Sequence, residues 1–318
     1  MMHDEKKTRL IDKLERELGE TILNAMRDRN VVEIMLNPDG KVWLDVAGKG
    51  MVDTGTTMMA SQALNLLGTI AATLDVVVNA EHPVLEGTLM LDGSRFEGLV
   101  PPLVAAPIFA IRKKAAMIFT LDDYVSKGIM RDDQAAAIRK AVIDRENVLI
   151  VGGTGTGKTT LANAVLQVVA DVAGGDERIA IIEDTAELQC PAQNKVEMLT
   201  SHNAGIDMIK LLKATMRLRP DRIVVGEVRG GEALALLKAW NTGHPGGVAT
   251  VHANSAAAGL IRLEQLVQEA GVPPQPALIA EAVNIIVSIA RTAEGRRVQE
   301  VCRVTGHSTK KGYEVVPA

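Results

Sequence analysis

The sequence predicts an α/β protein in which a smaller α+β domain precedes a domain built on a mostly parallel sheet. An apolar repeat of helical period opens the chain, short extended runs separated by turn residues follow, and apolar runs then alternate with helical patterns. The 318 residues, 47% of them hydrophobic, are enough to bury two cores. We place the domains at 1–119 and 120–318.

The first element is a predicted helix over residues 4–30. Its apolar residues recur every four positions and so form one face: Leu10, Leu14, Leu18 and Ile22. The polar face mixes both signs of charge, whereas a helix that lies on a membrane is usually biased to Lys and Arg. We therefore expect this face to pack against its own domain, with docking to a membrane or a partner as the alternative.

Two hairpins are predicted next. The turn sequence Pro-Asp-Gly at 38–40 separates two runs of strand type, and Asp92-Gly93 repeats this pattern further on. The prolines at 101, 102 and 107 confine the following segment to extended or loop geometry. A short helix at 120–131, capped by Thr120 or Asp122 and ended by Gly128, then opens the second domain.

The second domain contains continuous apolar runs, rich in β-branched residues, interleaved with helical patterns. These runs are NVLIVGG, RIAIIED, DRIVVGE, GGVATVHA and NIIVSIA. Such strands are typical of a parallel sheet that is buried on both faces.

A phosphate-binding loop is the strongest signal in the chain. The first run leads directly into a G-x-x-x-x-G-K-[ST] motif, which predicts that nine residues bind nucleotide phosphates: Gly152, Gly153, Thr154, Gly155, Thr156, Gly157, Lys158, Thr159 and Thr160. Its glycines let backbone N–H groups meet phosphate oxygens, and the following helix adds its positive end. Lys158 should reach the β and γ phosphates, and the Thr159 hydroxyl should ligate Mg²⁺.

Acidic residues end two neighbouring strands, at Glu183-Asp184 and at Glu227. Ligands of open α/β sheets bind at the carboxyl ends of the strands, so both acids should face the phosphate loop. One of Glu183 and Glu227 would act on the attacking water and the other would hold Mg²⁺ through water. Helix capping is the alternative role for each acid.

Charge and composition argue against strong nucleic-acid binding. The net charge is −4, the pI is about 5.9 and only 2% of residues are aromatic, so the chain offers neither a uniform positive field nor many stacking platforms.

The charged first residues lack an apolar signal region, and Cys190 and Cys302 form no CxxC pair. We expect a cytoplasmic protein.

These blocks together resemble the secretion ATPase superfamily that includes VirB11-type ATPases and the PilT and GspE motors. The matching blocks, in the family's order, are Walker A at 152–159, an Asp box at RIAIIEDTAEL, an atypical Walker B at RIVVGEVRGGEA and a His box at GGVATVHANS. SRFEGLVPP and FAIRKK also resemble segments that carry two nucleotide-reaching arginines in VirB11-type proteins.

The resemblance implies a RecA-like P-loop ATPase that binds ATP and Mg²⁺. It gives Arg95 and Arg112 the role of phosphate-sensing or finger residues and makes His252 functional. It also implies a homohexameric ring, peripheral to the inner membrane, that works with inner-membrane components of a secretion or conjugation apparatus. Arg217, Arg219 and Arg229 are further finger candidates, with surface salt bridges as the alternative.

Within the superfamily the chain looks most like the conjugative-transfer branch, the TrbB proteins, because the tetracysteine module of many GspE proteins and the C-terminus of PilT are not evident. The resemblance therefore predicts a motor for conjugative type IV secretion, with Glu183 as the base and Glu227 on the Mg²⁺ side, although the two roles are exchangeable. The alternatives are a pilus-retraction or type II secretion motor, a nucleotide-gated scaffold, a small-molecule phosphotransferase and a DNA translocase.

Overall fold

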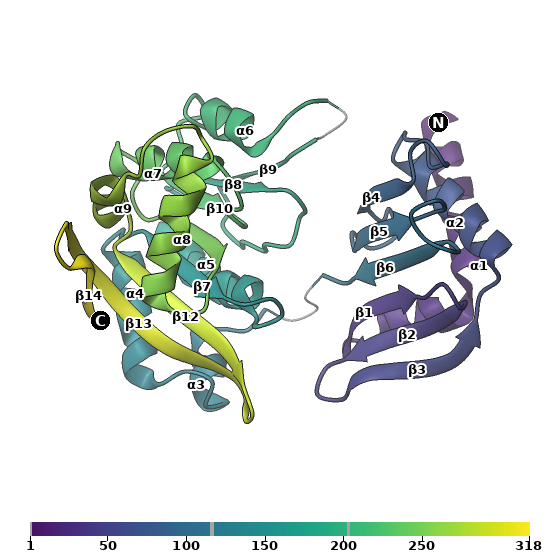
Figure 1. Cartoon of the computed structure of the whole chain (residues 1–318), viewed down its shortest axis with the longest axis horizontal. Coiled ribbons are helices and arrows are strands. Elements are labelled where there is room, and N and C mark those ends of the chain that lie inside the picture. Colours follow the sequence, from purple (N-terminus) through teal and green to yellow (C-terminus); the bar gives the residue numbers. More distant parts are fainter. Residues whose placement is uncertain (1, 115–117, 202–203) are drawn as a thin grey trace. The chain divides into compact units, whose positions relative to one another are not determined.

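The computed structural model describes residues 2–114, 118–201 and 204–318, with side chains from Thr8 onward (Figure 1). The chain forms two compact units, Met1–Ala116 and Met117–Ala318. The first unit holds an antiparallel sheet with helices, and the second holds a mostly parallel sheet between helices. The predicted fold class is confirmed.

The first unit is a six-stranded sheet in the order β3-β2-β1-β6-β5-β4, in which every neighbouring pair is antiparallel. Its elements are α1 (Met2–Arg27), β1 (Val31–Leu36), β2 (Lys41–Val46), β3 (Gly50–Thr57), α2 (Ala60–Thr73), β4 (Val84–Thr88), β5 (Arg95–Leu99) and β6 (Ile108–Arg112). Leu14, Leu18 and Ile22 of α1 are buried in this unit's core, as predicted for the apolar face of the first helix.

Both predicted hairpins are present in the first unit. Strands β1 and β2 meet around Gly40, and β4 and β5 meet around Gly93. Both glycines have positive φ, 80° and 74°, a conformation that a side chain at these turns would strain.

The second unit is an eight-stranded sheet in the order β14-β13-β12-β7-β11-β10-β8-β9. Its strands are β7 (Val148–Gly152), β8 (Ile179–Glu183), β9 (Lys195–Leu199), β10 (Arg222–Val225), β11 (Val248–His252), β12 (Ile285–Thr292), β13 (Gly295–Ser308) and β14 (Gly312–Pro317). All five predicted runs form strands, and these strands are parallel to one another. The sheet is extended by β9 at one edge and by the antiparallel β13 and β14 at the other.

Helices cover both faces of this sheet, as predicted. They are α3 (Leu121–Ser126), α4 (Asp132–Ile143), α5 (Lys158–Ala173), α6 (Met208–Thr215), α7 (Glu232–Asn241), α8 (Ala256–Gln268) and α9 (Pro276–Ala282). One core packs α3, α4 and α5 against Ile150 and its neighbours, and the other packs α6 to α9 against Val151 and its neighbours. Since successive strand residues point to opposite faces, β7 contributes to both cores.

The start and stop signals predicted for the helix after residue 119 are present in α3. Thr120 caps α3, because its hydroxyl accepts a hydrogen bond from the Asp123 N–H at 3.1 Å, and Gly128 follows the helix with φ of 64°.

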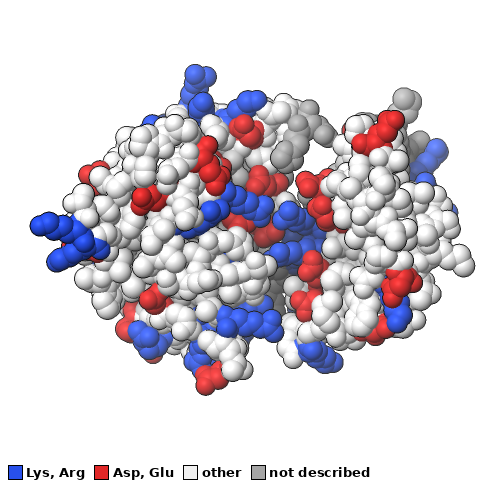
Figure 2. All heavy atoms as spheres, viewed as in Figure 1, with Lys and Arg blue, Asp and Glu red and all other residues white. Residues whose placement is uncertain are grey.

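Among the described residues no helix combines the length and apolarity that a membrane span needs. On the face shown in Figure 2, Lys and Arg side chains are interspersed with Asp and Glu in each unit.

Candidate active site

The phosphate loop joins the buried strand β7 to the N-terminus of α5, as the motif predicts. Gly157 caps α5 with a φ of 98°, a backbone conformation that residues with a side chain rarely adopt. A Cβ built on Gly152 would lie 2.5 Å from the Ile289 carbonyl oxygen, so the loop packs tightly against β12. The arrangement presents the first N–H groups of a helix, which is a site for anions.

Lys158 is held at the loop by two neighbours. Its Nζ donates to the Gly153 carbonyl at 3.1 Å and lies 3.2 Å from Nδ1 and 3.4 Å from Nε2 of His252. His252 ends β11, directly beside Gly152 in the parallel pairing of β7 with β11. The His box and Walker A, which are 94 residues apart at this contact, therefore meet at one edge of the sheet.

His252 also connects Lys158 with the Walker B acid. Its Nε2 lies 2.6 Å from Oε1 of Glu227, which is an ion-pair distance when the imidazole is protonated. The other carboxylate oxygen of Glu227 accepts from Nε of Arg229 at 2.7 Å. We call the series Lys158, His252, Glu227 and Arg229 the Lys158–Arg229 contact series.

Glu183 is the buried acid of the site, with only 6% of its surface exposed. Its Oε1 accepts hydrogen bonds from the backbone N–H groups of Glu187 at 3.0 Å and Leu188 at 2.9 Å. Burial raises the pKa of Glu183 from 4.5 to about 7, against these two hydrogen bonds, which lower it. A Cβ on Gly226 would lie 2.8 Å from Glu183 Cγ, so the glycine that follows β10 makes room for this acid.

The raised pKa gives a pH prediction for Glu183 as general base. The base must be ionised, so kcat/KM for ATP is expected to rise with pH with an apparent pKa of about 7. The pKa of Glu183 in the folded protein is higher than its ordinary value of 4.5, so the fold favours the protonated carboxyl. The free energy of unfolding should therefore fall as pH rises from 4.5 to about 7. The measurement is the pH profile of initial rates at low ATP concentration.

Glu197→Gln is the matched variant for this profile. The charge of Glu197, on the neighbouring strand β9, raises the pKa of Glu183, so removing it should shift the profile to lower pH. A kcat/KM that is constant between pH 5.5 and 8 would exclude Glu183 as the titrating base.

Glu187 is a site residue that the sequence reasoning did not identify. The Thr159 hydroxyl, predicted to ligate Mg²⁺, donates to Oε2 of Glu187 at 3.3 Å. Glu187 lies in the loop after β8, whereas the predicted acids were expected at strand ends. Its position four residues after Glu183, within the Asp box, is the signal that could have identified it.

The donor set suits a nucleotide-bound Mg²⁺. Hydroxyl and carboxylate oxygens are its ligands, and Mg²⁺ is commonly held by one or two protein groups together with substrate phosphates. Thr159 and Glu187 supply such oxygens side by side, while Glu227 contacts His252 and Arg229. Among the described side chains no group of three or more His, Cys, Asp and Glu residues forms a separate metal centre. The metal role of Glu227 stays a prediction.

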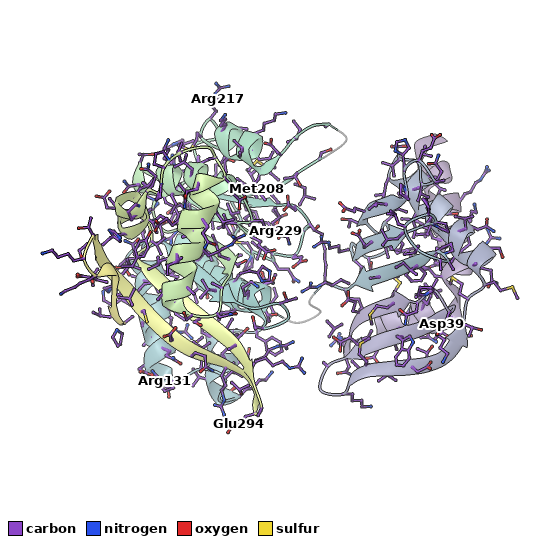
Figure 3. All side chains as sticks on the ribbon, in the orientation of Figure 1. Asp39, Arg131, Met208, Arg217, Arg229 and Glu294 are labelled. Atoms are coloured by element: carbon purple, nitrogen blue, oxygen red, sulfur yellow. The ribbon has the colours of Figure 1, made fainter. Side chains whose placement is uncertain are left out.

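The other arginine candidates fall in different places. Arg229 pairs with Glu227 and lies 4.0 Å from Asp184, so it belongs to the site. Arg217 follows α6 and projects well away from Arg229 (Figure 3). In the first unit Arg95 and Arg112 are directly opposite each other on β5 and β6, so both side chains leave the same face of that sheet. Their role at the nucleotide stays a prediction.

Comparison with known proteins supports the resemblance. Residues 96–313 match the family model of the type II/IV secretion system protein. The chain is 53% identical to the probable conjugal transfer protein TrbB of Sinorhizobium fredii over 307 residues, which cover 96% of this chain and 93% of the relative. It is 30% identical to the type IV secretion system protein VirB11 of Bartonella henselae over 290 residues, which cover 79% of this chain and 80% of the relative.

Among solved structures, the ATPase DotB of Legionella pneumophila is similar with a TM-score of 0.63 and 18% identity. The match covers 88% of this chain and 79% of that chain. At this identity the likeness concerns the fold alone. The greater identity to a TrbB protein than to a VirB11 protein agrees with the branch predicted from the motifs.

Proposed function

The chain belongs to the type II/IV secretion system protein family as a VirB11-type ATPase, and we propose that it hydrolyses ATP with Mg²⁺ as a hexameric ring motor of conjugative type IV secretion. The motor would drive pilus assembly or substrate transfer at the cytoplasmic side of the inner membrane, together with membrane components of the apparatus. The observation that carries the ATPase proposal is the Lys158–Arg229 contact series, because it joins three of the four sequence blocks at one sheet edge.

The proposed reaction is attack of a water molecule on the γ phosphate. A bond forms between the water oxygen and the γ phosphorus, the bond from that phosphorus to the β–γ bridging oxygen breaks, and Glu183 takes the proton of the water. The loop N–H groups and Lys158 would hold the phosphates. Thr159, together with Glu227 or Glu187, would hold Mg²⁺, which when bound would neutralise phosphate charge. Buried Glu183 suits this role, because its raised pKa makes it a stronger base than an exposed carboxylate.

Assembly and turnover are tested together. We expect light scattering of the full chain to give the mass of six copies in the presence of Mg²⁺ and ATP, and a coupled assay to show phosphate release without an added acceptor. A species of lower mass that still releases phosphate would contradict the ring but not the ATPase. Tight ATP binding without phosphate release would favour the nucleotide-gated scaffold. ADP formation only with an added acceptor, without release of inorganic phosphate, would favour the phosphotransferase.

A further inference from the structure

The hairpin of β12 and β13 presents two arginines beside the phosphate loop. Arg291 and Arg296 are directly opposite each other in the antiparallel pairing, so both side chains leave the same face of the hairpin. Ile289 lies two residues before Arg291 and therefore points to the same face. The hairpin ends at the turn that holds Glu294 (Figure 3).

This face of the hairpin is the one that packs on the loop. A Cβ built on Gly157 would lie 3.4 Å from Cδ and 3.6 Å from Nε of Arg296, and 3.9 Å from Cδ1 of Ile289. Arg296 also lies near the buried Tyr124. Burial raises the pKa of this phenol, and the positive charge of Arg296 opposes that rise. The Arg296 side chain thus stands at the N-terminus of α5, next to the glycine that caps the helix.

No acidic residue in the described part of the chain forms an ion pair with either arginine. Arg297, on the other face, pairs with Glu294 and donates to the Gly128 carbonyl, and Arg303 pairs with Glu146. Arg291 and Arg296 have no ion-pair partner among the described residues. Since like charges directly opposite on a sheet repel, an anion next to this pair would be stabilising.

The order of strands indicates which part of a nucleotide this pair meets. Strand β7, which leads into the loop, lies between β12 on one side and β11 on the other. The acids and His252 come from β11, β10 and β8, on the side where the γ phosphate is expected to react. The arginines come from the opposite side of β7, so we expect them at the nucleoside end of the triphosphate.

We propose that Arg296, supported by Arg291, binds the α-phosphate of the nucleotide and so serves ADP and ATP alike. The proposal rests on the proposed ATPase site and adds a cation to the end of the site remote from hydrolysis. Charge-assisted hydrogen bonds of this kind contribute about 1.5–3 kcal/mol, which corresponds to roughly 10- to 100-fold in affinity.

The test is calorimetric titration of the full chain with ADP and with a non-hydrolysable ATP analogue. Arg296→Ala should weaken both ligands by the same factor, about tenfold, and Arg296→Lys should weaken them less, because it keeps the charge but not the planar donors. Lys310→Ala, which removes one cation from the turn between β13 and β14, is the matched control and should bind as the parent does.

Unchanged ADP affinity in Arg296→Ala would overturn the proposal. Weaker binding of the ATP analogue alone would also overturn it, because that result would place Arg296 at the γ phosphate. Failure of the ATPase proposal gives a different pattern: a parent chain that binds ADP through Arg296 and yet releases no phosphate would contradict the motor and leave the α-phosphate site standing.

Discussion

Replacing Lys158 by alanine is expected to lower ATP turnover at least about 100-fold, the usual cost of removing one donor to a developing phosphate charge. The side chain is 8% exposed and its ammonium contacts Gly153 and His252, so the variant loses the charge at the centre of the site. Alanine continues a helix well, and α5 should therefore remain folded. The measurement is phosphate release at saturating ATP and Mg²⁺.

Two controls make the Lys158→Ala result specific. Lys213→Ala removes a lysine from the last turn of α6 and should retain the parent rate. Far-ultraviolet circular dichroism of Lys158→Ala should match the parent spectrum. A folded Lys158→Ala that turns over ATP at the parent rate would reject the site assignment altogether.

The glutamine variants of the two acids are expected to fail in different ways. Glu183→Gln removes the proposed base and should lower kcat by about 10²- to 10⁴-fold, with little change in the Mg²⁺ concentration required. Glu227→Gln keeps the base but changes the partner of His252 and Arg229, and with Glu227 on the metal side it should raise the Mg²⁺ concentration needed for half-maximal rate. The measurement is a Mg²⁺ titration of the rate for each variant.

The comparison of the two variants decides between the exchangeable roles. If Glu183→Gln raises the Mg²⁺ requirement and Glu227→Gln lowers only kcat, the base and the metal-side acid are reversed. Glu187→Gln belongs in the same series, because Glu187 contacts the Thr159 hydroxyl and competes with Glu227 for the metal-side role. Asp176→Asn, in the loop after α5, is a control that removes one acid outside the site.

The sequence was most informative where backbone chemistry determines the structure. Apolar runs of five to eight residues allowed all five central strands to be predicted, and the glycine spacing predicted the loop between β7 and α5. The edge strands were missed for a physical reason: β9 alternates exposed and half-buried residues, and its polar positions gave no continuous apolar run.

The site was predictable in its members more than in its contacts. Glu183 and His252 end strands of one parallel sheet and Glu227 follows β10 by two residues, which is why the sequence pattern predicted all three at one sheet edge; their roles stay predictions. Which acid His252 contacts depends on side-chain orientation across three strands, which no local pattern encodes. Glu187 and Arg296 escaped because one lies in an irregular loop and the other in a hairpin that approaches the loop only through the pairing of β12 with β7.

The contact between Lys158 and His252 has a consequence for how a nucleotide arrives. In the protein alone the ammonium already has hydrogen-bond partners, so capture of a triphosphate is an exchange of partners and not a simple addition. The measured affinity is therefore reduced by the free energy of releasing the old partner. His252 also contacts Glu227, so a nucleotide that takes over the Lys158 ammonium would change the surroundings of a residue that touches the Walker B acid.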